Sequence, residues 1–214
     1  MDLGIQKITE RIAEFFTIFD FSFFISGMAT FAAICYGLWE TDLFYPFDNT
    51  FSNVAGSVVS SYVCGLVSFA GGKYLRGKWI EKKRIDKKTR FMYCFTETIK
   101  YVKKNQYNET DYKDEFYCKT YYTEMWMNLR QNEKNKETLA FLNKYWVFQA
   151  IYEGLMSSCL VGIAVGIILL IVEGFSWVYL LVISACGLSL CICCNEATRY
   201  AETQIKEIII ANLK

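Results

Sequence analysis

The chain has 214 residues, of which 53% are hydrophobic and 21% charged, and its formal net charge is only +1. It contains no histidine, which excludes Ser-His and Cys-His dyads and removes the commonest metal ligand. The charges are segregated, since there is no Lys or Arg from Ile12 to Gly72 or from Tyr145 to Thr198. Two long blocks without basic residues on either side of a soluble block indicate an integral membrane protein.

The first 20 residues carry a single apolar stripe. Its members are spaced by three and four and are Ile5, Ile8, Ile12, Phe15 and Phe19. This spacing predicts an amphipathic N-terminal helix over residues 1–20. Two interpretations stay open: the helix lies on the inner membrane surface, or it packs on the protein's own cytoplasmic domain.

Residues 21–72 are predicted to form a first transmembrane hairpin. From Phe21 to Trp39 there is no Asp, Glu, Lys or Arg, and this length of helix crosses a hydrocarbon core of about 30 Å. The second span, from about Phe51 to Gly72, is less apolar and carries a polar stripe of Asn53, Ser57, Ser61, Cys64 and Ser68. Such a stripe either packs on another helix or faces water. If the protein forms a pore, these five residues are the candidates to line it.

A strongly basic run follows the second span directly. Between Lys73 and Arg90 nine basic residues stand against two acidic ones, and the nine are Lys73, Arg76, Lys78, Lys82, Lys83, Arg84, Lys87, Lys88 and Arg90. Basic residues beside a span mark its cytoplasmic end. This collar is also suited to anionic lipid headgroups, and a third interpretation is binding of nucleotides or nucleic acid.

Residues 73–148 are predicted to form a helical cytoplasmic domain, because alternation of period two is nowhere sustained. Ile85, Met92 and Ile99 suit a helix that continues out of the basic run. Thr110 is the expected cap of a second helix, which runs to about Arg130, and a third helix leads into the next span.

Residues 149–194 are predicted to form a second transmembrane hairpin, with spans over Gly154–Val172 and Trp177–Cys194. Ser158, Gly162 and Gly166 recur every four residues in the first of them. This small-xxx-small pattern lets two helix backbones approach closely and predicts a helix-packing face. Residues 195–214 keep helical spacing and are expected to form a cytoplasmic C-terminal helix.

No pattern in the chain indicates catalysis. The nine cysteines avoid the expected outer loops, so reduced thiols are predicted. Cys191, Cys193 and Cys194 point in different directions on a helix, and the acids of the soluble block have the spacing of a solvated face. We therefore expect no enzyme activity, cofactor or metal.

The predicted fold is all-α, with four transmembrane helices in two hairpins and a helical insert between them. Both termini are expected in the cytoplasm and the protein in the inner (plasma) membrane. The small size, short hairpins such as Gly154–Cys194, helical cytoplasmic parts and lack of a catalytic set resemble the small multi-pass membrane effectors of bacterial anti-phage systems, including SLATT-type and CRISPR-accessory membrane proteins.

This resemblance implies a self-associating protein that permeabilises the inner membrane. The leading expectation is an oligomer that forms or gates a pore and is regulated through residues 73–148 by a cytoplasmic protein or a nucleotide. The alternative is a membrane-anchored interaction or scaffold module without conductance.

Overall fold

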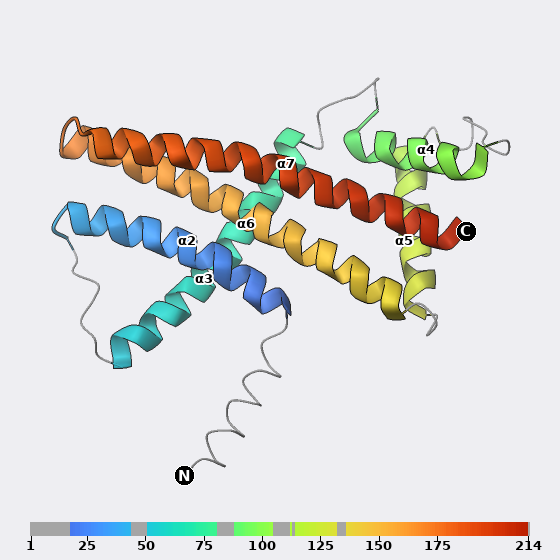
Figure 1. The fold of residues 1–214 in the computed structure, drawn as a ribbon, viewed down its shortest axis with the longest axis horizontal. Coiled ribbons are helices and arrows are strands. Elements are labelled where there is room, and N and C mark those ends of the chain that lie inside the picture. Colours follow the sequence, from blue (N-terminus) through green and yellow to red (C-terminus); the bar gives the residue numbers. More distant parts are fainter. Residues whose placement is uncertain are drawn as a thin grey trace, which may run out of the picture. The chain divides into compact units, whose positions relative to one another are not determined.

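The computed structural model describes residues 18–43, 51–80, 88–104, 112, 114–131 and 136–213, with the side chains of 18–20, 51–55 and 79 left out. Every regular element in these ranges is helical, as predicted. They are α2 (Ile18–Glu40), α3 (Phe51–Leu75), a π-helical segment (Arg76–Ile80), α4 (Arg90–Lys103), α5 (Glu115–Gln131), α6 (Lys136–Val172) and α7 (Trp177–Leu213), as Figure 1 shows. The expected N-terminal helix lies almost wholly outside the described residues.

Three of the described helices are long and apolar enough to cross a membrane, whereas four were expected. They are Phe21–Glu40, Lys136–Val172 and Trp177–Leu213, with mean hydropathies of 1.6, 2.8 and 2.2 in their most apolar windows. Helix α3 does not reach this hydropathy over residues 56–75, the part of the helix whose side chains the structure describes. Within the described residues the chain is all-helical and has three long apolar helices.

The chain divides into two compact units. Unit 1 comprises Met1–Lys73 and Ala150–Cys194, and unit 2 comprises Tyr74–Gln149 and Asn195–Lys214. Residues 195–214, expected as a separate C-terminal helix, are the continuation of α7 and belong to unit 2.

Unit 1 is built on close contact between helix backbones. A Cβ atom added at Gly65 of α3 would overlap the carbonyl oxygen of Phe23 in α2, and one at Gly27 would overlap that of Ser61. A Cβ at Gly72 would likewise overlap the carbonyl of Glu153 in α6. Glycine at these positions lets α3 approach both α2 and α6 at backbone distance. Helices α6 and α7 form an antiparallel hairpin closed by a short turn at residues 173–176 (Figure 1).

The interior of unit 1 is small and polar while much of its surface is apolar. Six hydroxyl side chains are at most 6% exposed: Ser22, Ser26, Thr30, Ser61, Ser68 and Ser158. Large apolar side chains of α3, α6 and α7 in this unit are exposed, and they include Val59, Val67, Ile171, Leu181 and Leu188. This distribution is the reverse of that in a water-soluble domain.

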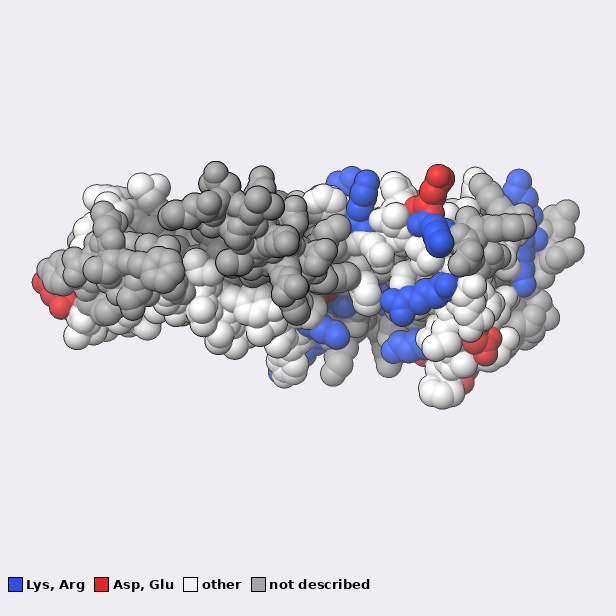
Figure 2. Space-filling model, turned by 90° about the horizontal axis from the view of Figure 1, so that it is seen from below, with Lys and Arg blue, Asp and Glu red and all other residues white. Residues whose placement is uncertain are grey.

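Unit 2 has the opposite distribution. Its core contains Phe95 and Ile99 from α4, Cys118, Met125 and Leu129 from α5, Leu142 from α6, and Ile205, Ile208 and Ile209 from α7, all at most 8% exposed. Four helices therefore share one apolar core, as in a soluble helical domain. Figure 2 shows Lys and Arg side chains gathered over one part of the face in view.

Local capping sets where the helices of unit 2 begin. Helix α4 begins at Arg90 because Thr89 caps it, its side chain accepting a hydrogen bond from the Met92 backbone N–H at 3.4 Å. The helix expected to continue from the basic run is therefore shorter than predicted at its start. Helix α5 begins at Glu115, with the Asp114 carboxylate accepting from the Phe116 N–H at 3.0 Å. The predicted cap, Thr110, lies outside the described residues.

Candidate functional sites

Three hydroxyl groups meet inside unit 1, each from a different helix. Thr30 Oγ1 of α2 lies 2.6 Å from Ser68 Oγ of α3 and 2.8 Å from Ser158 Oγ of α6. Ser158 Oγ in turn lies 2.9 Å from the carbonyl oxygen of Ser26 and 3.0 Å from that of Gly154. We call Thr30, Ser68 and Ser158 the hydroxyl cluster.

The number of protons available fixes the direction of the hydrogen bonds in the cluster. Each hydroxyl has one proton to donate. Thr30 donates to Ser158 at 2.8 Å and has the Ser26 carbonyl oxygen as a second acceptor at 3.2 Å, and Ser158 donates to the carbonyls beside it. The contact between Ser68 and Thr30 then requires Ser68 to be the donor. The chain of bonds runs from Ser68 through Thr30 and Ser158 to backbone oxygen, and hydrogen bonds in such a series strengthen one another.

Small residues around the cluster allow the three helices to meet. A Cβ at Gly154 would lie 2.5 Å from the side chain of Ser26, and one at Gly71 would lie 2.7 Å from Ser157 Oγ. Ser26 folds its own hydroxyl back onto the carbonyl of Phe23 at 3.1 Å. The cluster therefore joins α2, α3 and α6 without leaving its hydroxyls unsatisfied.

The predicted pore-lining stripe of α3 divides between interior and surface. Ser61 and Ser68 are 5% and 3% exposed, Ser61 facing Gly27 of α2 and Ser68 belonging to the hydroxyl cluster. Ser57 and Cys64 are half-buried. Asn53 has no described side chain. The geometry of Ser61 and Ser68 is that of helix packing, the first of the two interpretations given for this stripe.

The small residues of α6 lie at two different contacts. Ser158 faces α2 through the hydroxyl cluster. A Cβ at Gly162 would lie 2.7 Å from Cys186 Sγ, and one at Gly166 would lie 2.6 Å from Ile183 Cγ1. Both glycines thus face α7 within one chain, and whether they also serve assembly stays a prediction.

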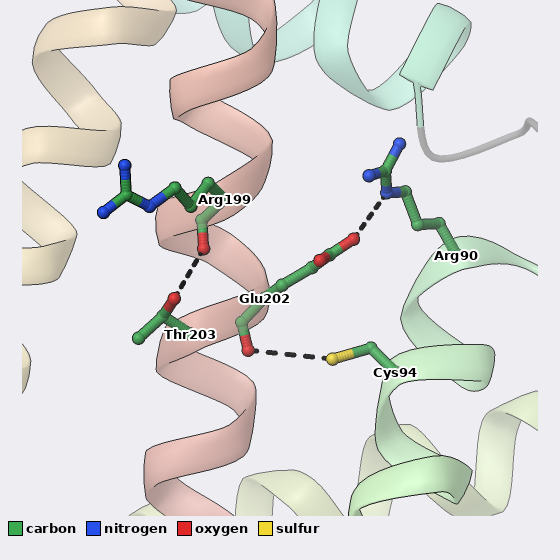
Figure 3. A network of polar contacts seen from close by, with 5 residues as sticks. All are labelled: Arg90, Cys94, Arg199, Glu202 and Thr203. Atoms are coloured by element: carbon green, nitrogen blue, oxygen red, sulfur yellow. Dashed lines mark hydrogen bonds and ion pairs between the residues drawn. The ribbon is translucent and has the colours of Figure 1, made fainter.

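A second candidate site is an open groove of about 520 Å³ in unit 2, between one face of α4 and the C-terminal part of α7. It is lined by Arg90, Tyr93, Cys94, Glu97, Thr98, Tyr101, Glu202, Lys206 and Ile210. At one end Arg90 Nε donates to Glu202 Oε1 at 2.6 Å, and these two side chains are about one third exposed. Figure 3 shows this pair and, one turn along α4, Cys94 Sγ directed at the Glu202 carbonyl oxygen at 3.7 Å.

The thiol in this groove is not poised for reaction. Burial, and secondarily the nearby Glu202 carboxylate, raise the pKa of Cys94 to about 11. A thiol is nucleophilic as the thiolate, so Cys94 is almost wholly unreactive at neutral pH. No group of three or more Cys, Asp or Glu side chains with the spacing of a metal site occurs within the described ranges.

Five of the nine members of the predicted basic collar lie among the described residues. Arg90 is held by Glu202 in unit 2, and Lys78 lies over the ring of Tyr74, with its Nζ 5.5 Å from the centroid. Lys73 and Lys78 are exposed, and Arg76 and Lys88 are half-buried. The remaining members, Lys82, Lys83, Arg84 and Lys87, lie outside the described residues.

The sequence contained a signal for the α2 side of the hydroxyl cluster that was not recognised. Ser22, Ser26 and Thr30 recur every four residues on α2 and are all buried. The Arg90–Glu202 pair had no comparable signal, because 112 positions separate its members.

Comparison with protein-family models, curated proteins and solved structures finds no match for the chain.

Proposed function

We propose that the protein is a multi-pass membrane protein whose apolar helices hold unit 2, a helical interaction domain, at the cytoplasmic face of the inner membrane. The observation that carries this proposal is the opposite burial in the two units. Unit 1 buries six hydroxyl side chains and exposes Val, Leu and Ile, whereas unit 2 buries a cluster of Phe, Ile, Leu and Met. Hydrocarbon favours the first arrangement and water the second.

Helix α3 is proposed as the fourth span despite its lower hydropathy. Its buried face consists of Ser61, Gly65, Ser68 and Gly72. Its large apolar side chains are exposed, and Val58, Val59, Val63, Leu66 and Val67 range from 42% to 68% exposed. A helix whose polar groups are satisfied by neighbouring helices and whose outer face is aliphatic is suited to lipid.

The orientation follows from the distribution of basic residues. Of 23 Lys and Arg residues, 18 lie between Lys73 and Lys144, and the segment between the first two spans has none. Positive charge stays on the cytoplasmic side, which supports a cytoplasmic location for unit 2 and both ends of the chain. Exposed Trp39, Phe175 and Trp177 then lie toward the outer interface, where aromatic side chains gather.

Accessibility of single cysteines tests the fourth span directly. In a cysteine-free background, Asp42→Cys and Ser176→Cys should react from outside with a membrane-impermeant thiol reagent, and Lys100→Cys should react only after the cells are opened. If α3 did not cross the membrane, positions 42 and 100 would label from the same side. Membrane pellets washed with alkaline carbonate should retain the protein, and its release would rule out insertion altogether.

The second candidate function is an oligomer that forms or gates a pore. It is favoured by the buried hydroxyls that follow α2 at Ser22, Ser26 and Thr30, a polar track inside an apolar unit. The interaction module ranks first because Ser61 and Ser68, two of the five proposed lining residues, are occupied by packing. A role in anti-phage defence, with a protein or nucleotide as trigger, stays a prediction from resemblance.

Ion flux from liposomes separates the two functions. An anchored module predicts flux no greater than that of empty vesicles at matched protein density. Flux above that level would put the pore first. In that case Ser57→Leu, at a half-buried position of the stripe, should reduce the flux, whereas Ser184→Leu on the exposed face of α7 should not.

A further inference from the structure

Two helices of unit 2 present a stack of aromatic rings together with two exposed cations. Phe148 of α6 and Tyr200 of α7 are stacked with their ring centroids 5.3 Å apart. Tyr145 adds a ring 5.9 Å from Tyr200, and Phe141 adds one 4.9 Å from Tyr145. Phe148 and Phe141 are 45% and 48% exposed, so this ring stack is an apolar surface that other described residues do not cover.

The cations belong to the same surface. The Arg199 guanidinium lies over the Tyr200 ring, 5.9 Å from its centroid, and the Arg199 side chain is 70% exposed. Lys144, one turn before Phe148 on α6, is exposed as well. Figure 3 shows that Arg199 extends from α7 away from Arg90 and α4, so this surface is separate from the groove.

Arg199 is only partly neutralised. Its Nη1 lies 3.2 Å from a Glu196 carboxylate oxygen, in an i,i+3 pair on the same helix. A guanidinium has five N–H donors, and the exposed side chain leaves donors for a second anion. Guanidinium groups match the geometry of phosphate oxygens, and a neighbouring ammonium adds a point charge.

The position of the rings along the helices is near the water-facing edge of the headgroup layer of a membrane. Phe148 lies about 9 Å of helix before Gly154, where one predicted span begins, and Tyr200 lies about 9 Å after Cys194, where the other predicted span ends. A headgroup layer extends roughly 5–8 Å beyond each side of the hydrocarbon. At the other end of α7, Trp177 stacks edge-on with Phe175 at 5.2 Å. From Trp177 to Tyr200 the helix rises about 35 Å, between the thickness of the hydrocarbon and that of the whole bilayer.

We propose that Lys144, Phe148, Arg199 and Tyr200 form a binding surface for the headgroup of an anionic phospholipid. The inference rests on the proposed membrane insertion. The rings indicate a lipid and not free phosphate, because a phosphate ion would neutralise the cations but leave the exposed rings in water. Aromatic side chains prefer this interfacial depth, and the two cations supply the preference for negative charge.

Native mass spectrometry of the full-length protein in detergent tests this surface with phosphatidylglycerol and phosphatidylcholine of matched chains. Phosphatidylglycerol should bind several-fold more tightly, and Arg199→Gln should weaken it roughly fivefold, with a similar loss for Lys144→Gln. Binding of phosphatidylcholine should change little. Arg199→Lys should keep most of the preference. The control Lys100→Gln, an exposed cation of α4, should bind as the parent does.

Three outcomes would contradict the proposal. Equal binding of the two lipids by the parent would show that the surface has no preference for anions. Unchanged phosphatidylglycerol binding in the double variant Lys144→Gln/Arg199→Gln would place the lipid elsewhere. Displacement of the lipid by millimolar inorganic phosphate would reduce the surface to an anion site. Retention in the carbonate-washed pellet together with any of these results overturns this surface alone, whereas release from the pellet overturns membrane insertion.

Discussion

Thr30 of α2 and Ser68 of α3 share a hydrogen bond of 2.6 Å between two side chains that are 6% and 3% exposed. Thr30 is the middle member of the hydroxyl cluster, since it also donates to Ser158 of α6. One side chain therefore connects three helices, and its loss affects two partners at once. In a membrane interior, Ser68 and Ser158 would have no water molecules with which to replace the lost hydrogen bonds.

Replacing Thr30 with Val removes the hydroxyl and keeps the shape of the side chain. Thr30→Val should destabilise unit 1 by about 1 kcal/mol, the scale of an interhelical hydrogen bond in a membrane, lowering the melting temperature in detergent. Thr123→Val, in which an exposed hydroxyl bonds only to its own helix, is the matched control and should change it little. An unaltered melting temperature in Thr30→Val would mean that the cluster contributes no net stability.

The glycines of unit 1 predict a ranking of alanine substitutions. Of three substitutions compared, Gly65→Ala should be the most destabilising, because its Cβ overlaps backbone of α2 that cannot move without separating the helices. In Gly162→Ala the added Cβ meets the Cys186 side chain, which can adjust, so this substitution should destabilise unit 1 less. Gly187→Ala has open space around it and should be neutral or mildly stabilising. Melting temperatures in one detergent measure the order, and a cost for Gly187→Ala equal to that of Gly65→Ala would contradict it.

The Arg90–Glu202 ion pair at the groove should contribute little to the stability of unit 2, despite its short distance. Arg90 and Glu202 are each about one third exposed, so solvent and salt screen their attraction. Glu202→Gln should reduce the stability of unit 2 by roughly 0.5–1 kcal/mol. A double-mutant cycle with Arg90→Gln isolates the pair, and its coupling energy should shrink in 1 M salt. Coupling that does not respond to salt would show that the pair is better shielded than its exposure implies.

The raised pKa of Cys94 predicts a loss of stability in alkali. Its folded-state pKa of about 11 lies above the ordinary value of 9.0. The unfolded chain therefore releases the proton first, and the contribution present below pH 9 disappears as pH rises to about 11, by roughly 2 kcal/mol. Cys94→Ala should flatten the decline in melting temperature across this window. A parallel decline in both proteins would assign the alkaline loss to other groups, including Tyr122, whose pKa is also raised by burial.

The reactivity of the same thiol provides an independent measurement. At pH 8 Cys94, as the single cysteine of the chain, should react with a small thiol reagent at least tenfold more slowly than a cysteine introduced at exposed Lys100, because it is 5% exposed and protonated. Urea should abolish the difference. Comparable rates in the folded protein would mean that the groove opens readily around Cys94.

Periodicity predicted the helices well because it depends on local residues alone. The apolar windows of α2, α6 and α7 were evident from the absence of Lys and Arg, and Ser158, Gly162 and Gly166 were recognised from their spacing. Which neighbour each face contacts depends on the arrangement of helices, so the sequence left open whether Ser61 and Ser68 face water or another helix. Helix starts were missed where a single cap decides, as at Thr89 and Asp114.

Long-range pairs were beyond sequence reasoning for a related reason. Arg90 was predicted as part of a lipid-facing collar from its neighbours in the chain, yet its partner Glu202 comes from the far end of α7. Likewise Tyr179 donates to Glu40 at 2.9 Å across 139 positions, and neither residue had a signal that pointed to the other. Such contacts depend on how the helices pack, which a single sequence does not specify.

The contribution of α7 to the core of unit 2 has a consequence for biosynthesis. Ile205, Ile208 and Ile209 line that core and are at most 8% exposed, but they are translated after the whole second hairpin. While the ribosome synthesises residues 150–194, residues 74–149 have already been made but lack the contribution of α7 to their core. Phe95, Ile99 and Leu142 are therefore exposed at this stage. This nascent domain is prone to aggregation at that stage, and it can close only after the C-terminal part of α7 has been made.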